Sequence, residues 1–361
     1  MFNFNWGKKQ AGGIDISDYA IEVALLSAKG NDLNLESLGR KILPPGVVAG
    51  GLPVDAKKLG EIVLNVLATA KPFAITKETF TFGLPERHFY THYFNPDQSI
   101  ISNPLALDAL ARELAEKHIP LPKARQIVSH KIILGADKIT RVLILVADSE
   151  AVSHWDNFFK SIGITVRAFE LETIATWRGI QPNHPNKNLC LVDIGARQSL
   201  IALFGTSGLY YTFANRLAGE ALTTALAVEL KLPMATAEAL KIKNGLNGSE
   251  ARVGQILKTT LAPLIEDLRA TFATKEIHLG ARPELLVLAG GSARLPGLVE
   301  YFNQEFRLKT VLPIISPMFI RAGEHRALFS NEAHLYLEAV GLAMRGLKGL
   351  KIGNDPYIPI K

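Results

Sequence analysis

The strongest constraint on the fold is a structural unit that the sequence starts twice. An apolar segment with a strand pattern leads into Asp15-Ile16-Ser17, and a second one leads into Asp193-Ile194-Gly195. After each of these turns, the apolar pattern predicts two further short strands and then a helix. We therefore predict an α/β protein built from two related halves that arose by duplication.

Both turns have residues that suit phosphate binding. A small residue after a strand lets backbone N–H groups approach phosphate oxygens, and the carboxylate beside it can hold a water of hydrated Mg²⁺. A third element, Gly290-Gly291-Ser292, follows the strand pattern of Glu284–Ala289, where the backbone can approach a base or a sugar. Each element alone is more often a simple turn, but the three in this order indicate a nucleotide site.

The stretch from Arg87 to about Phe169 has a different pattern of apolar residues, which predicts a compact, inserted α+β block. Within it we predict helices over Leu105–Lys117 and Ser149–Ile162, and strands over Arg125–Leu134 and Arg141–Ala147.

The second half continues with helices over Gly219–Leu230 and Met234–Asn244, and then a long amphipathic helix. We expect the apolar stripe of that helix, from Val253 to Phe272, to be buried in its own domain. A closing helix is predicted over Asn331–Leu347, and the tail from Lys348 is expected to be loosely ordered.

Composition narrows the class of protein. The chain has 361 residues, of which 48% are hydrophobic and 20% charged, as in an ordinary globular protein with more than one domain. Its net charge is +6, but the cations are scattered, so we expect no nucleic-acid partner. The single cysteine, Cys190, lies in an apolar run and is expected to be a core residue.

Membrane spanning is not expected, because no apolar stretch approaches the ~20 residues that a transmembrane helix requires. The start of the chain lacks the apolar core of a signal peptide, which favours a cytoplasmic protein. Its aromatic residues Phe2, Phe4 and Trp6 precede Lys8 and Lys9. This segment could dock on its own domain or touch a membrane interface, and the sequence leaves both open.

Seven segments spread over almost the whole chain resemble one known family. They are Gly13–Ser27, Leu43–Leu67, Phe82–Glu86, Leu191–Leu203, Ala237–Lys241, Leu288–Leu298 and Val340–Gly346. In these segments the sequence is similar to the PilM family of type IV pilus assembly proteins, within the superfamily of actin, heat-shock chaperones and sugar kinases.

The resemblance implies an actin-like (ribonuclease H-like) duplicated fold with an inserted subdomain 1C of the kind found in the cell-division protein FtsA. Subdomain 1A would comprise residues 1–87 and 169–187, and subdomain 1C residues 88–168. Subdomain 2A would comprise residues 188–235 and 281–361, and subdomain 2B residues 236–280.

The resemblance also implies ATP with Mg²⁺ in the interdomain cleft, with Asp15 and Asp193 facing each other and holding the metal through water. Two residues depart from the family's first phosphate turn: Ser17 replaces a glycine, and Glu22 replaces a lysine. We expect both changes to weaken phosphate binding. Serine restricts how closely phosphate can approach the backbone, and the carboxylate of Glu22 repels the phosphate charge. The implied nucleotide contacts are Asp15, Ser17, Asp193, Gly195, Ala196, Gly219, Glu220, Glu238, Lys241, Gly290, Gly291 and Ser292.

For function, the resemblance implies a scaffold at the inner face of the cytoplasmic membrane. Its partners would be the extended cytoplasmic tail of the inner-membrane protein PilN and other components of the pilus assembly platform. We predict no enzyme activity beyond weak ATP turnover, because the sequence shows no recognisable carboxylate base beside a polar substrate pocket. The alternatives are an ATPase or small-molecule kinase of the same superfamily, and a polymerising protein like FtsA.

Other polar and aromatic groups have simpler interpretations. His88 and His92 lie in a strand-like region without a third metal ligand nearby, so no metal site is predicted there. Asp137 and Asp148 are expected to be turn or helix-cap residues. The aromatic residues of Phe89–Phe94 are expected to be core, with a partner groove beside them as the alternative.

Overall fold

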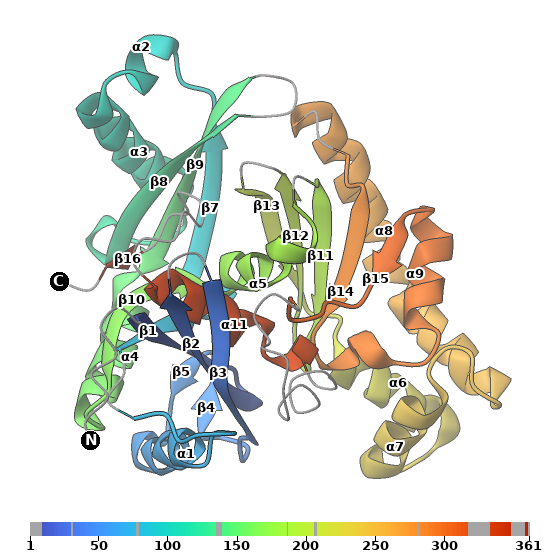
Figure 1. Ribbon diagram of the computed structural model, residues 1–361. Helices are drawn as coiled ribbons and strands as arrows, with labels where there is room; N and C mark the ends of the chain where they lie inside the picture. Colours follow the sequence, from blue (N-terminus) through green and yellow to red (C-terminus); the bar gives the residue numbers. More distant parts are fainter. Residues whose placement is uncertain are drawn as a thin grey trace. The chain divides into compact units, whose positions relative to one another are not determined.

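The computed structural model describes residues 9–29, 32–76, 79–134, 139–185, 187–205, 208–279, 282–316, 333–347 and 358–359 (Figure 1). The chain forms two compact units. The first comprises Met1–Ile133, Thr140–His184 and Ile314–Lys361, and the second comprises Leu134–Ile139 and Pro185–Pro313.

A six-stranded sheet organises the first unit, in the order β16-β10-β6-β1-β2-β3. Strands β1, β6 and β10 run parallel to one another, and β2 and β3 follow β1 as an antiparallel meander. The strands are β1 (Lys9–Ile16), β2 (Ala20–Lys29), β3 (Asp32–Ile42), β6 (Thr79–Leu84), β10 (Thr165–Leu171) and β16 (Ile358–Pro359), and a small hairpin joins β4 (Val48–Ala49) to β5 (Leu52–Pro53).

Helices cover the two faces of this sheet. Alternation along β1 sends Ile14 and Ile16 into a core with α1 (Ala56–Ala68) and α4 (Ser149–Ser161). The opposite face, with Gly13 and Asp15, meets α5 (Glu172–Ile180) and α11 (Leu337–Gly346). Strand β1 therefore presents Asp15 to the α5 and α11 side of the sheet.

The position of the closing helix corrects the expected domain assignment, which placed residues 281–361 together in the second half. Helix α11 packs on β1, β6 and α5 of the first unit. Glycine makes this possible, because a Cβ at Gly13 would collide with the backbone of Ala339 in α11. The chain from Ile314 onward accordingly belongs to the first unit.

The inserted block forms a three-stranded sheet, in the order β7-β9-β8, with α3 packed on one face. It is smaller than the predicted 88–168, because α4 and β10 belong to the core of the first unit. There Phe82 of β6 packs on Trp155 and Phe159 of α4, with ring centroids 4.6 and 5.0 Å apart. The insert comprises β7 (Phe89–Phe94), α2 (Gln98–Ile101), α3 (Pro104–His118), β8 (Gln126–Leu134) and β9 (Thr140–Asp148).

The second unit repeats the topology of the first. Its sheet has the order β13-β12-β11-β14-β15, which matches β3-β2-β1-β6-β10 strand for strand, with an antiparallel meander followed by two parallel strands. The predicted duplication is therefore present in the fold. The strands are β11 (Leu189–Ile194), β12 (Ser199–Gly205), β13 (Gly208–Asn215), β14 (Leu285–Ala289) and β15 (Lys309–Val311).

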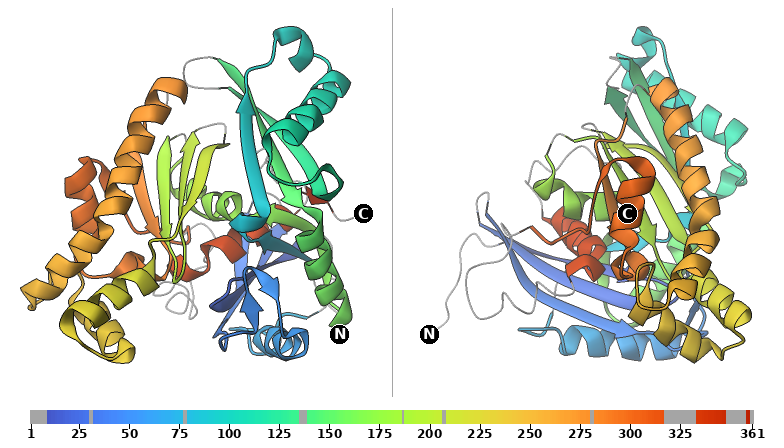
Figure 2. Two further views of the ribbon diagram at one scale, coloured as in Figure 1. Left: turned by 180° about the vertical axis from the view of Figure 1, so that it is seen from behind. Right: turned by 90° about the vertical axis from the view of Figure 1, so that its right-hand side faces the viewer.

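The helices of the second unit are α6 (Gly219–Leu230), α7 (Met234–Asn244), α8 (Ala251–Leu279) and α9 (Leu298–Phe306). Both α6 and α7 have the predicted bounds. Helix α8, seen along its length in Figure 2, buries Val253, Leu257, Leu261 and Leu268, so the apolar stripe is core as expected. Among the described residues, no helix is both long and apolar enough to cross a bilayer.

Candidate functional site

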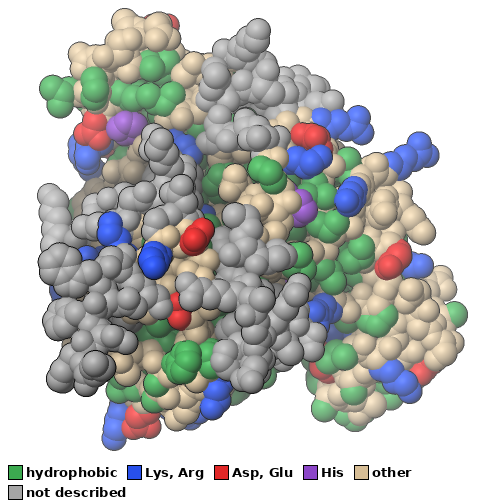
Figure 3. All heavy atoms as spheres, in the orientation of Figure 1, with side chains coloured by type: hydrophobic (Ala, Val, Ile, Leu, Met, Phe, Trp, Pro, Cys, Tyr) green, Lys and Arg blue, Asp and Glu red, His purple; other side chains and the backbone are tan. Residues whose placement is uncertain are grey.

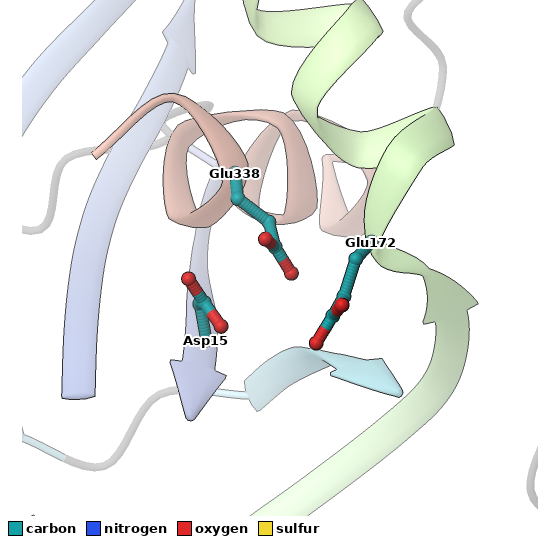
Figure 4. A group of neighbouring side chains, drawn as sticks. All are labelled: Asp15, Glu172 and Glu338. Carbon is teal, nitrogen blue, oxygen red and sulfur yellow. The ribbon is translucent and has the colours of Figure 1, made fainter. Parts of the chain in front are cut away.

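Three carboxylates converge on the α5 and α11 side of the first sheet. Asp15 stands near the end of β1, Glu172 begins α5 directly after β10, and Glu338 lies in the first turn of α11. One carboxylate oxygen from each lies within 4.8 Å of the others, and Figure 4 shows the side chains pointing toward one another. This is the edge where parallel strands end, the usual place for ligands in α/β sheets. We call these three residues the acidic cluster.

Buried polar contacts fix the segments that carry the acidic cluster. The guanidinium of Arg178 in α5 donates to both oxygens of Glu170 at 2.5 Å and to the carbonyl of Gly341 in α11 at 3.0 Å. Both charged side chains are at most 1% exposed. This ion pair joins β10, α5 and α11, and so holds Glu172 and Glu338 in place.

A second buried contact orients the start of α5. Thr173 donates from its hydroxyl to Oε2 of Glu86 at 2.6 Å. The backbone N–H of Glu86 in turn donates to Oε2 of Glu172 at 3.3 Å. Glu86, just after β6, therefore helps to hold the start of α5, and with it Glu172 of the acidic cluster, in position.

The two predicted phosphate turns have the same length and the same closing bond. Counted between the last register pairs, Ile16 with Ile21 and Ile194 with Ser199, each turn holds four residues, 17–20 and 195–198. The N–H of Ser17 donates to the Ala20 carbonyl at 2.9 Å, as the N–H of Gly195 donates to that of Gln198 at 3.1 Å. The duplication thus extends to the turns themselves.

The turns differ in one hydroxyl. Oγ of Ser17 accepts from the backbone N–H groups of Tyr19 at 3.2 Å and Ala20 at 3.0 Å. Gly195 has no such group. In addition, the Asp18 carboxylate accepts from the N–H groups of Gly50 and Gly51, at 3.1 and 2.8 Å. The Ser17 side chain therefore closes the first turn, in which three N–H groups are already donated, and Asp18 ties the turn to the β4–β5 hairpin.

The expected effect of Glu22 needs a correction. Its carboxylate is nearly buried and accepts from Nε of Arg40 on β3 at 2.6 Å. Asp15, Glu22 and Arg40 are register partners across β1, β2 and β3. Because Arg40 balances the charge of Glu22, the repulsion of phosphate should be smaller than the charge of Glu22 alone would give, and the effect of Glu22 on nucleotide binding stays a prediction.

In the second unit, the structure brings the predicted nucleotide residues together. The N–H groups of Gly219 and Glu220 donate to the carbonyls of Gly195 and Ala196, at 2.9 and 2.8 Å. Gly290 has φ +80°, and any Cβ there would meet the Asp193 carboxylate. Gly290, which directly follows β14, therefore lies beside the end of β11 and its turn.

The environment of Asp193 is apolar enough to disfavour its charge. Burial raises the pKa of this carboxyl to about 6. Asp15 and Asp193 belong to different units, so their predicted meeting across a cleft, and the shared Mg²⁺, stay predictions.

The side chains of Lys241 and Glu238 contact the start of α6, beside the turn that follows β11. Nζ of Lys241, which is 4% exposed, donates to the Gly219 carbonyl at 3.0 Å and to the Thr223 hydroxyl at 2.8 Å. It also pairs with Glu238 at 2.7 Å. Gly291 has open space beside its Cα, and Ser292 is buried in the turn that follows.

The remaining polar predictions have plain structural roles where they are described. Nε2 of His88 is 3.0 Å from the Gly50 carbonyl, and His92 stacks on His118. Asp148 caps α4 through the Glu150 N–H and pairs with Arg125, as expected of a cap residue. Asp137 lies outside the described residues, as does the aromatic N-terminal segment.

Two other expectations concern apolar groups. Cys190 is fully buried, which raises the pKa of its thiol, and it is a core residue as predicted. On β7, Phe89 packs on the core of the first unit, whereas Tyr90 and Phe94 pack on that of the insert. All residues of β7 are half-buried, so these rings line the two cores from the outside instead of lying within them.

Among the described side chains visible in Figure 3, Lys and Arg are interspersed with acidic and apolar ones. The absence of a nucleic-acid partner stays a prediction.

Sequence reasoning found Asp15 but missed Glu172 and Glu338. A carboxylate directly after a strand could have pointed to Glu172, but β10 and α5 were not predicted. No sequence pattern placed Glu338 near Asp15, because the closing helix was expected in the second half of the chain.

These two sheets of matching topology define an actin-like fold, and comparison with solved structures supports this class. The structure described as the PilM-PilN type IV pilus biogenesis complex matches with a TM-score of 0.78 and 19% identity, covering 94% of this chain and 98% of that one. The ethanolamine utilization protein EutJ from Carboxydothermus hydrogenoformans matches with a TM-score of 0.56 and 16% identity, over 94% and 90% of the two chains.

The family model described as type IV pilus assembly protein PilM matches residues 13–347, so the chain belongs to the PilM family. The cell division protein FtsA of Pseudomonas aeruginosa is 24% identical over 231 residues, which are 58% of this chain and 54% of FtsA. The chain thus aligns with about half the length of that relative.

Proposed function

We propose that this protein is a scaffold of the type IV pilus assembly platform that binds the cytoplasmic tail of PilN and thereby stays at the inner face of the membrane. The family match over residues 13–347 carries this proposal. A fold similar to that of the PilM-PilN complex over 94% of the chain supports it. Other platform components are expected to bind the same scaffold.

A role in ATP turnover is the weaker candidate, because the residues fit a nucleotide in the second unit only. The open backbone at Gly291 and the Gly195 and Gly219 turn would accept the nucleoside side and a phosphate. In the first unit, Oγ of Ser17 already accepts from two backbone N–H groups of the turn, and the acidic cluster concentrates negative charge. We expect weak nucleotide binding and little or no hydrolysis.

The experiment for the scaffold role is capture by an immobilised PilN tail. Purified full-length protein is passed over the cytoplasmic tail peptide of the PilN encoded by the same organism, and over a scrambled peptide of equal composition. The proposal expects retention on the first only. Equal passage over both would reject PilN as the partner.

A further inference from the structure

The two matching turns carry charges of opposite sign. Residues 17–20 are Ser-Asp-Tyr-Ala, and residues 195–198 are Gly-Ala-Arg-Gln. Asp18 therefore puts a negative charge in the first turn, and Arg197 puts a positive charge in the second. Of the two turns, the second is the one whose charge suits an anionic ligand.

The turn that carries Arg197 packs on the first residues of α6. The N–H of Glu220 donates to the Ala196 carbonyl at 2.8 Å, and the Glu220 carboxylate accepts from Nε of Arg197 at 3.0 Å. Both charged side chains are about half exposed, Arg197 at 49% and Glu220 at 57%. Because exposed ion pairs contribute little to stability, an anionic ligand can take the guanidinium from Glu220 at small cost.

A second cation near the start of α6, Lys241, is held by the protein itself. It is buried, and its ammonium contacts Gly219, Thr223 and Glu238 at 3.0 Å or less. A guanidinium group can also bind a phosphate through two parallel hydrogen bonds, a geometry that an ammonium group does not offer. Arg197 is therefore better suited than Lys241 to hold a phosphate group.

We propose that Arg197 is a phosphate-binding residue of the second unit, and that Glu220 is the internal anion from which a chain of phosphates takes it. This rests on the weak nucleotide binding proposed for the protein, in which the backbone at Gly195 and Gly291 accepts the rest of the nucleotide. Glu220 then competes with the ligand, whereas the family resemblance implied that it contacts nucleotide. Either a nucleoside triphosphate or free tripolyphosphate supplies the chemistry that Arg197 recognises.

The test titrates ATP, tripolyphosphate and adenosine, each with Mg²⁺, into full-length variants and follows the heat of binding. Arg197→Ala removes the guanidinium, Arg197→Lys keeps the charge without the planar fork, and Glu220→Gln removes the competing anion. Arg252→Ala is the matched control, because it removes an exposed arginine of the same unit at the start of α8. Thermal unfolding of each variant checks that the fold is retained.

We expect Arg197→Ala to weaken the binding of ATP and of tripolyphosphate about tenfold, as for a lost hydrogen bond to a charged group. Arg197→Lys should lose less. Glu220→Gln should strengthen the binding of both ligands about two- to threefold, because an exposed competing pair is removed. Adenosine has no phosphate, so its affinity should be the same in every variant, and Arg252→Ala should match the wild type with all three ligands.

Equal affinity of ATP for the wild type and Arg197→Ala would overturn the role of Arg197 and leave nucleotide binding in place. A loss that is as large for adenosine would overturn it too, because it would indicate a damaged turn and not a lost phosphate contact. Unchanged affinity in Glu220→Gln would overturn the competition.

If tripolyphosphate binds as tightly as ATP and adenosine does not bind, the site takes free polyphosphate, and the nucleotide is not its particular ligand. If the wild type binds neither ATP nor tripolyphosphate up to about 10 mM, this proposal fails together with nucleotide binding. Retention on the PilN tail does not involve Arg197, so the scaffold role is tested separately.

Discussion

At the scale of single residues, the Ser17 hydroxyl closes the first predicted phosphate turn in a way that Gly195 cannot close the second. Ser17→Gly removes the acceptor that holds the N–H groups of Tyr19 and Ala20, and gives the first turn the glycine of the second. We expect affinity for ATP with Mg²⁺ to rise about fivefold, which corresponds to roughly 1 kcal/mol for hydrogen bonds made available. Titration calorimetry measures this change. Ser17→Thr, which keeps a hydroxyl, is the matched control, and equal affinities for all three proteins would contradict the closed-turn interpretation.

Asp193 predicts a pH dependence of stability. Its pKa of about 6 lies above the ~3.9 of an unfolded aspartate, so between these values the folded state holds more protons. Wild-type stability should therefore fall as pH rises from about 4 to 6, by at most ~3 kcal/mol from this group. Urea unfolding of Asp193→Asn should lack that fall.

The matched control for this pH profile is Asp55→Asn, at an exposed N-cap where asparagine caps equally well. It should follow the wild-type profile. A profile for Asp193→Asn that is parallel to wild type from pH 4 to 7 would show that the folded-state pKa of Asp193 is not raised.

Residue-scale prediction from sequence succeeded where a side chain acts on its own turn. Ser17 was identified as a departure, and the structure adds how it closes the turn. The effect assigned to Glu22 was incomplete, because its partner Arg40 lies on a third strand, and no local pattern reveals register across a sheet.

At the scale of elements, the Glu170–Arg178 pair should be the main tie between β10, α5 and α11. Arg178→Met leaves a buried carboxylate without its cation, which typically costs about 3 to 5 kcal/mol. Replacing both residues with Met should recover most of that loss. Urea unfolding measures each variant.

Arg112→Met removes an exposed ion pair with Asp108 and serves as the control, with an expected loss within about 0.5 kcal/mol. If Arg178→Met is no more destabilising than this control, the buried pair does not hold the three elements together.

Elements with one apolar face were predictable, and those buried all round were not. The apolar stripe of α8 was predictable from its spacing, and Val253, Leu257, Leu261 and Leu268 on that stripe are buried. Helix α5 buries all eight residues from Thr173 to Ile180, so it has no polar face to give a helical period. Helix α11 was predicted as a helix, but its placement on the first unit depends on close backbone approach at Gly13, which spacing does not encode.

At the scale of the whole molecule, the chain keeps both halves of an actin-like protein but not equal phosphate turns. The strand orders of the two sheets match, and several residues predicted to contact nucleotide in the second half lie together around Gly219. The first half instead carries a closed turn, an acidic cluster and an added edge strand. This asymmetry supports our proposal of a binding scaffold, with little or no ATP turnover.

The most direct test of that claim is calorimetric titration of the PilN-tail peptide into the full-length protein, with and without ATP and Mg²⁺. The account predicts saturable binding with one peptide per chain, of similar affinity in both conditions. Absence of binding to folded protein up to about 1 mM peptide, where even weak complexes form, would contradict it. Binding that appears only when ATP is hydrolysed would contradict it equally.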